Sequence, residues 1–227
     1  MNKIVLNGMA LITMFSSNIK AQMEDAGQNY VKLQFVQPLG EYNDFYNSGF
    51  GAEFGRMFPL NFDIADGLIM PGLDITFIST QFNTGKEYEY IPATSLTPAL
   101  ATKSGLLWNL GVKLGPMVTI GITDGLVADF SIQYDPTVVF SLGRKGIDAD
   151  KLATGVVKEK SASSVSFAHR IGIKGDIRYT HFLFGLEFVL GSTTLHYNHS
   201  IIPEGASLTD ETSLGLGTLL LNFGFTF

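Results

Sequence analysis

The sequence has no cysteine, little charge and no uninterrupted apolar run long enough to be a membrane helix. Without cysteine, no disulfide, no thiolate zinc site and no lipid-modified N-terminal cysteine can form. Only 16% of the 227 residues are charged, whereas an average soluble domain has about 25%. The net charge is −6 and no dense basic patch is present, which argues against nucleic acid as a partner. Glycine and phenylalanine, at 25 and 18 residues, are abundant instead.

Residues 1–21 have the layout of a cleaved secretory signal peptide. Lys3 precedes an apolar core from Ile4 to Phe15, and the small residue Ala21 ends the segment. This core is too short to cross a bilayer as a helix, which takes about 20 residues. We therefore predict cleavage after Ala21, which leaves residues 22–227 as a single domain. Cleavage removes two lysines and no acidic residue, so the net charge changes from −6 to −8.

The end of the chain alternates between large apolar side chains and smaller or polar ones. The large ones occupy every second position, at Leu219, Leu221, Phe223, Phe225 and Phe227. A period of two places them on one face of a β-strand. Chain termini are usually the least ordered part of a soluble protein. The run is therefore typical of a strand that closes a barrel whose outer face contacts lipid.

The same period recurs in seven further runs, at residues 30–35, 50–55, 73–77, 105–122, 128–134, 165–174 and 182–191. Together they predict an all-β fold, an eight-stranded antiparallel up-and-down transmembrane β-barrel. The run 105–122 is the one candidate for a membrane helix, but its four glycines and Pro116 favour a strand. Pro116 predicts a bulge or an early end to this strand, with a ten-stranded barrel as the alternative.

The predicted connections alternate in length. Short turns are expected at Pro59–Gly67, Thr123–Gly125 and Gly175–Thr180, and longer polar loops at Gly40–Ser48, Asn83–Ser104, Ser141–Ser163 and Ser192–Thr212. Outer-membrane barrels have short turns at one rim and long loops at the other. With an even number of strands, both termini are expected at the periplasmic, short-turn rim.

The composition of the second face decides which face meets lipid. A soluble, lipocalin-like barrel would turn its apolar face inward, and its other face would then meet water. That other face is poor in charge and rich in small residues, which suit the crowded inside of a small barrel. Its charges balance four against four: Lys32, Lys113, Arg170 and Lys174, with Glu53, Asp74, Asp129 and Glu187. We interpret them as an interior network that fills the barrel, or alternatively lines a narrow ion path.

The signal sequence that ends in Lys-Ala-Gln, the eight runs and the terminal Phe223-x-Phe225-x-Phe227 pattern resemble the small outer-membrane β-barrel domain proteins of Bacteroidetes. The resemblance implies a location in the bacterial outer membrane and contact with its lipid. It also implies that the barrel-assembly machinery recognises the three terminal phenylalanines. It implies a fold and a location rather than an activity, because such barrels have structural, adhesive, transport and secretion-related roles.

No catalytic, cofactor-binding or metal-binding residues are predicted. Some outer-membrane barrels are lipid A deacylases, in which a His-x-Ser run on one strand supplies the catalytic pair. That run is absent here, because His169 is followed by Arg170 and Ile171. His196 and His199 lie without a carboxylate or thiol cluster beside them, so a metal role is not expected. The loop aromatics Tyr42, Phe45, Tyr46, Tyr88 and Tyr90 are interpreted either as partner contacts or as an aromatic girdle at the rim.

The sequence therefore predicts a non-enzymatic outer-membrane barrel with a structural or loop-mediated binding role and an interior filled by side chains. One alternative is a narrow, porin-like passage for small or apolar solutes. Another is an accessory barrel of a secretion or polysaccharide system. The sequence does not identify the partner of the loops.

Overall fold

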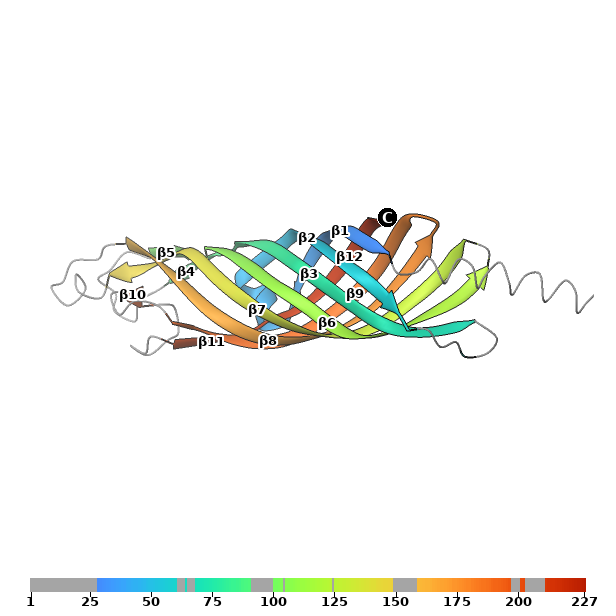
Figure 1. Ribbon diagram of the computed structural model, residues 1–227. Helices are drawn as coiled ribbons and strands as arrows, with labels where there is room; N and C mark the ends of the chain where they lie inside the picture. Colours follow the sequence, from blue (N-terminus) through green and yellow to red (C-terminus); the bar gives the residue numbers. More distant parts are fainter. Residues whose placement is uncertain are drawn as a thin grey trace, which may run out of the picture.

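Eight long antiparallel strands form a closed barrel in the computed structural model (Figure 1). The structure describes residues 28–60, 64, 68–90, 100–103, 105–123, 125–148, 159–196, 201–202 and 211–227. The barrel strands are β1 (Asn29–Leu39), β2 (Tyr46–Pro59), β3 (Ile69–Gly85), β6 (Leu106–Thr123), β7 (Leu126–Asp148), β8 (Glu159–Tyr179), β9 (Phe182–His196) and β12 (Gly217–Thr226). The residues of the predicted signal peptide, 1–21, lie outside the described residues.

The barrel closes because β1 pairs with β12 on one side and with β2 on the other. The remaining neighbours pair in the order β2, β3, β6, β7, β8, β9, β12, all antiparallel. The short strand β11 (Glu211–Gly215) extends the line of β12, since both pair with β9. The predicted eight-stranded, up-and-down barrel is therefore confirmed.

Strand β6 runs through Pro116 without a break, so the predicted bulge at this proline and the ten-stranded alternative are both wrong. Pro116 pairs with Leu73 of β3, and the register with β7 is unchanged on either side of it. A single missing N–H leaves the ladders to both neighbours otherwise intact. The register shift lies instead in β3, at Phe77 and Ile78, which both face outward.

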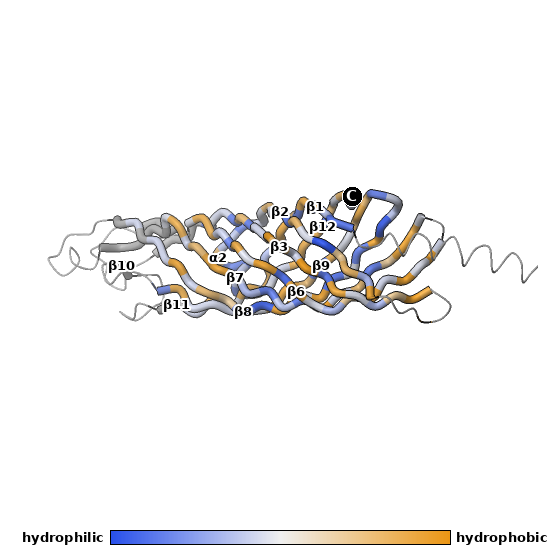
Figure 2. Tube along the Cα trace, viewed as in Figure 1, coloured by the Kyte–Doolittle hydropathy of each residue, from blue (hydrophilic) through white to orange (hydrophobic). Residues whose placement is uncertain are grey.

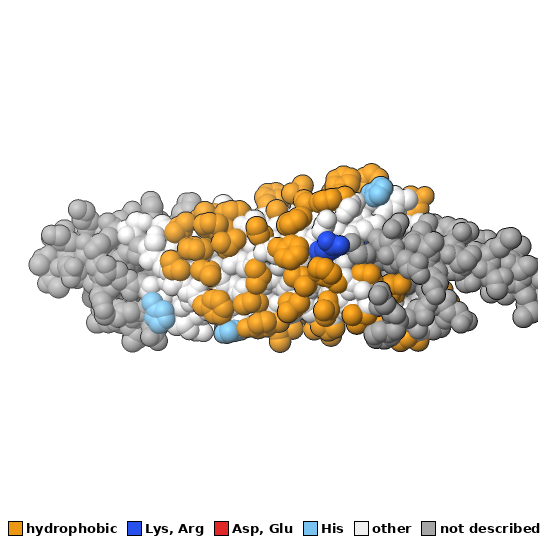
Figure 3. All heavy atoms as spheres, in the orientation of Figure 1, with side chains coloured by type: hydrophobic (Ala, Val, Ile, Leu, Met, Phe, Trp, Pro, Cys, Tyr) orange, Lys and Arg blue, Asp and Glu red, His pale blue; other side chains and the backbone are white. Residues whose placement is uncertain are grey.

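The two faces of the barrel wall differ sharply in chemistry. Large apolar side chains are exposed on the outer face along all eight strands, while the inner face holds buried polar and charged groups. The resulting alternation along each strand is visible in Figure 2. On the side shown in Figure 3, hydrophobic side chains form a broad belt, and no described acidic side chain is visible. Among the described residues, no helix is long and apolar enough to cross a membrane.

The strands extend further toward the long-loop rim than the sequence predicts. The predicted loops contain the helix α2 (Glu41–Phe45) and the short strands β4 (Glu87–Tyr90), β5 (Leu100–Lys103), β10 (Ile201–Ile202) and β11. Figure 1 shows β4, β5, β10 and β11 together at one end of the barrel. Strands β7 and β8 also continue into the predicted loop 141–163.

One predicted short turn is misplaced. Strand β8 continues to Tyr179, so the chain reverses at Thr180 and His181 rather than over residues 175–180. Gly175 and Asp176 resemble a turn signal, but the period of two continues through them, with Asp176 buried and Ile177 exposed. The turns between β2 and β3 and between β6 and β7 lie where they are predicted.

Candidate functional site

The barrel interior contains eleven buried ionisable side chains in the described strands that form ion pairs. They are Lys32, Lys113, Arg170, Lys174 and Arg178, with Glu53, Asp74, Asp129, Asp135, Asp176 and Glu187. All eight charged residues expected in the interior lie there, and Asp135, Asp176 and Arg178 join them. Sequence reasoning misses these three because the predicted strands 128–134 and 165–174 end just before them. Continued alternation through Pro136 and Ile177 was the signal that could have found them.

In the centre of the barrel interior, one lysine forms ion pairs with two carboxylates. Lys113 of β6 forms ion pairs with Glu53 of β2 and with Glu187 of β9, whose Oε1 lies 2.5 Å from the lysine Nζ. The Ser79 hydroxyl also donates to Glu53 Oε1 at 3.2 Å. All three charged side chains are buried. This triad therefore holds two carboxylates for each cation.

Beside the triad lies a balanced group of two lysines and two aspartates. Lys32 Nζ is 2.6 Å from Asp176 Oδ2, and Lys174 pairs with Asp74 and lies 3.8 Å from the same Asp176 oxygen. The Tyr30 hydroxyl donates to Asp74 Oδ1 at 2.9 Å. Because these residues come from β1, β3 and β8, the group links opposite parts of the wall.

Two arginine–aspartate pairs lie outside the lysine clusters. Arg170 Nη2 is 2.7 Å from Asp135 Oδ2, and its Nη1 donates to Gln81 Oε1 at 3.1 Å. Arg178 binds Asp129 in a bidentate manner, at 2.5 and 3.1 Å. Two-point pairing is the strongest geometry for a guanidinium and a carboxylate. Buried charges are tolerated only when they are paired in this way.

Glycines on the inner face make room for the charged side chains. At Gly185, an added Cβ atom would lie 1.8 Å from Asp176 Oδ1. At Gly172, it would lie 2.8 Å from Glu187 Oε1. The high glycine content therefore has a local cause, because the carboxylates occupy the space that side chains on the neighbouring strands would fill.

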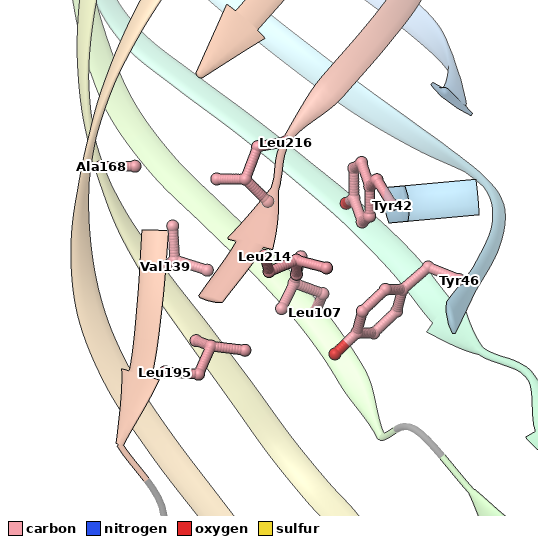
Figure 4. Close-up of a cluster of buried hydrophobic side chains, with 8 residues drawn as sticks. All are labelled: Tyr42, Tyr46, Leu107, Val139, Ala168, Leu195, Leu214 and Leu216. Carbon is pink, nitrogen blue, oxygen red and sulfur yellow. The ribbon is translucent and has the colours of Figure 1, made fainter. Parts of the chain in front are cut away.

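Apolar clusters lie on both sides of the charged centre. Toward the short-turn rim, Tyr30, Met57 and Met117 pack together inside the barrel. Toward the long-loop rim, a larger cluster contains Tyr42, Tyr46, Leu107, Val139, Ala168, Leu195, Leu214 and Leu216 (Figure 4).

The helix α2 contributes to the cluster at the long-loop rim. The buried Tyr42 hydroxyl donates to Asn83 Oδ1 of β3 at 2.7 Å, and Glu41 Oε2 accepts from the Gly215 N–H at 3.3 Å. Burial raises the pKa of the Tyr42 hydroxyl well above its usual value, so this group stays a donor. Tyr42 and Tyr46 are therefore buried members of the apolar cluster at the long-loop rim. Both interpretations from the sequence, an exposed partner contact and a rim girdle, are wrong for these two tyrosines.

Several buried polar atoms in the described interior have no hydrogen-bond partner in the protein. They include both amide atoms of Gln133, Glu53 Oε2, Glu187 Oε2 and Gln81 Nε2. Gln133 lies beside Gly172 of β8, and the backbone of Gly115 approaches it from β6. Unsatisfied polar groups with free space beside them are the usual positions of buried water. In the described interior, these atoms are the ones that an enclosed water would need as partners.

The described residues offer no constellation for metal chemistry. No group of three or more histidine, cysteine or carboxylate side chains in the described part of the chain is arranged to hold a metal ion. His169 lies on the outer face, where its ring stacks on Tyr134 with centroids 5.9 Å apart and its Nδ1 hydrogen-bonds the tyrosine hydroxyl. His199 lies outside the described residues.

The three terminal phenylalanines lie on the outer face. Phe223, Phe225 and Phe227 are all exposed, and the rings of the first two pack at a tilt against Phe184 and Phe182 of β9. The backbone N–H and C=O of Phe227 both bond to Asn29, each at 3.0 Å. These residues therefore belong to the seam between the first and last strands of the barrel.

No family model matches the sequence, and a search of curated proteins finds no match. Among solved structures, the chain is similar to Ail of Yersinia pestis, the attachment invasion locus protein, in a complex with the heparin analogue sucrose octasulfate. The identity is 12%, with 88% of this chain and 99% of that chain covered and a TM-score of 0.38. It is also similar to the outer membrane protein OprG of Pseudomonas aeruginosa, with 14% identity, 89% and 96% coverage and a TM-score of 0.39.

The class of the protein follows from its own architecture. A closed antiparallel barrel satisfies its backbone hydrogen bonds between its own strands, and an apolar outer belt around a charged, paired interior is stable in lipid rather than in water. The protein is a small transmembrane β-barrel of the bacterial outer membrane.

Proposed function

We propose that the protein is a non-enzymatic outer-membrane barrel with a filled interior, and that it acts by binding at its long-loop rim. The observation that carries the proposal is the presence of an apolar cluster at each end of the barrel interior. Apolar clusters stand at both ends of the charged centre, and α2 forms part of the outer one. A wall held by buried ion pairs supplies a rigid support for loops, which is where binding residues usually lie.

Two partners follow from the same proposal. The outer-membrane lipid contacts the apolar belt, and the barrel-assembly machinery recognises the strand that carries Phe223, Phe225 and Phe227. No nucleic-acid partner and no cofactor are required.

A narrow passage is the second candidate, and one observation favours it. The Gln133 amide and the second carboxylate oxygens of Glu53 and Glu187 are buried inside the barrel without a hydrogen-bond partner, so they could contact a polar solute. A displacement of α2 would open the long-loop mouth toward them. The passage would then suit small polar solutes or ions rather than apolar ones.

Conductance across a planar lipid bilayer separates the two candidates. The filled-barrel proposal predicts no steady openings for the reconstituted wild-type protein. Removing part of the outer cluster, by Tyr42→Ala together with Leu107→Ala, is expected to produce openings only if the charged centre is itself permeable. Steady wild-type openings that disappear in Glu53→Gln or Arg170→Gln would overturn the proposal in favour of a passage.

A further inference from the structure

A hollow of about 750 Å³ lies on the outer face of the barrel, across β8, β9, β12, β1 and β2. Two rows of outward-facing residues run across these strands on either side of it. The first row contains Gly175, Leu186, Leu221, Phe35 and Phe50, and the second contains Ile177, Phe184, Phe223 and Leu33. The hollow is thus a trough that crosses the strands.

The floor of the trough has a simple structural cause. Gln34 and Asn222, which lie between the two rows, turn their side chains into the barrel, where they bond to each other at 3.0 Å. Only their backbone faces outward, as does that of Gly185. Gly175 deepens the trough at its β8 end because it has no side chain. A Cβ atom there would contact only the ring of Phe130, at 3.5 Å.

Rigid aromatic contacts hold the sides of the trough in place. The rings of Phe184 and Phe223 pack at a tilt with their centroids 4.8 Å apart, and Phe35 meets Phe50 edge to face at 6.0 Å. Such pairs restrict the rings beyond their simple burial. The side chains therefore do not collapse into the space between the rows.

The dimensions and position of the trough fit a hydrocarbon chain. Four strand spacings of about 4.8 Å give a length of about 19 Å. One acyl chain crosses half of a hydrocarbon core of about 30 Å, which is about 15 Å. The trough is continuous with the apolar belt, so it opens directly into the lipid that surrounds the barrel. We propose that it binds one acyl chain of a membrane phospholipid as a resident lipid.

Gly175 provides a direct test, because a larger side chain there fills the trough without backbone strain. The wild type, Gly175→Phe and Gly175→Leu would be folded into phosphatidylethanolamine vesicles, extracted into a mild detergent and analysed by native mass spectrometry. Val112→Phe is the matched control, since it adds apolar bulk to an exposed site on β6, away from the trough. Heat-modifiable gel migration verifies that each variant is folded.

The proposal predicts one retained phospholipid on the wild type and on Val112→Phe, and at least a fivefold lower retained fraction on both Gly175 variants. Equal retention by all four proteins would overturn it. A wild-type dimer that Gly175→Phe dissociates would also overturn it, because the occupant would then be a second copy. Retention of free fatty acid in place of phospholipid would do the same. If Gly175→Phe fails to fold, Phe50→Ala removes one wall and is expected to lower retention as well.

Discussion

Glu53 and Glu187, on strands that do not touch each other in the barrel, are joined through the ammonium group of Lys113. The other buried pairs of the described interior are balanced one to one, whereas this triad has one carboxylate in excess. Loss of the lysine should therefore destabilise the barrel more than loss of one glutamate, and mutation can measure the difference.

Lys113→Met is expected to be far more damaging than loss of either glutamate. It leaves two buried carboxylates without a cation, and breaking a buried pair in this way costs about 3–5 kcal/mol. Glu187→Gln keeps a one-to-one pair between Lys113 and Glu53, so we expect a loss of about 1 kcal/mol or less. Urea unfolding of the barrel in vesicles, followed by gel migration, measures both. Equal losses of unfolding free energy in Lys113→Met and Glu187→Gln would contradict the pairing of one lysine with two glutamates.

Gly185→Ala is expected to destabilise the barrel, whereas Gly175→Ala is not. The new methyl group at position 185 would collide with Asp176 Oδ1 and disturb the ion pair between Asp176 and Lys32. Overpacking of this kind costs about 1–3 kcal/mol. At position 175 the methyl group meets only the Phe130 ring, at an ordinary van der Waals distance of 3.5 Å, and we expect a change within about 0.5 kcal/mol. The two variants lie in the same hairpin, so the difference in their unfolding midpoints isolates the collision.

The Tyr42 hydroxyl is expected to make the barrel sensitive to alkaline pH. Its pKa is raised by burial in the folded protein, while an unfolded tyrosine titrates near pH 10. The folded state therefore binds more protons above about pH 10, and the stability that this group contributes falls as pH rises. Tyr42→Phe removes the titration. The difference in unfolding free energy between wild type and Tyr42→Phe, measured at about pH 8 and about pH 11, should change by more than experimental error. A constant difference would contradict the assignment.

Phe227→Ala separates a targeting role of the terminal phenylalanine from a structural one. The substitution keeps the two backbone hydrogen bonds to Asn29, so folding of the purified protein into vesicles is expected to be nearly normal. Assembly in cells is expected to fall several-fold, because the recognition that we propose for the assembly machinery uses this aromatic ring. Normal assembly in cells would count against the signal. Deleting residue 227 also removes both hydrogen bonds and is expected to impair folding in vesicles.

Much of the architecture can be predicted from the sequence, because the period of two is a local property. Alternation alone identifies the eight strands and the outward set, and it assigns Lys32 and Glu53 to the inside. Strand ends are harder to predict where turn-forming residues lie within a strand. Gly175 and Asp176 show this, since the pairing with β9 continues past them to Tyr179.

The pairing of charges depends on long-range register, which one sequence does not reveal. Lys32 and Asp176 are 144 positions apart in the chain and meet only because the barrel closes with one particular stagger. The role of Tyr42 is equally hidden, because a five-residue helix has no period that distinguishes an inward from an outward side. Its burial comes from the strands around it, so a local reading of the loop places it on the surface.

The seam between β1 and β12 has a consequence for how the barrel forms. Its pairs, such as Tyr30 with Thr226, join residues separated by about 200 positions, whereas the other neighbours are connected through hairpins. Contacts between such distant parts of a chain form slowly, because the intervening chain must first be ordered. Until the seam is made, both edge strands present unpaired backbone that would bind any other strand. The barrel is therefore most prone to aggregation before β1 pairs with β12. A chaperone that covers these two edge strands would act at this step.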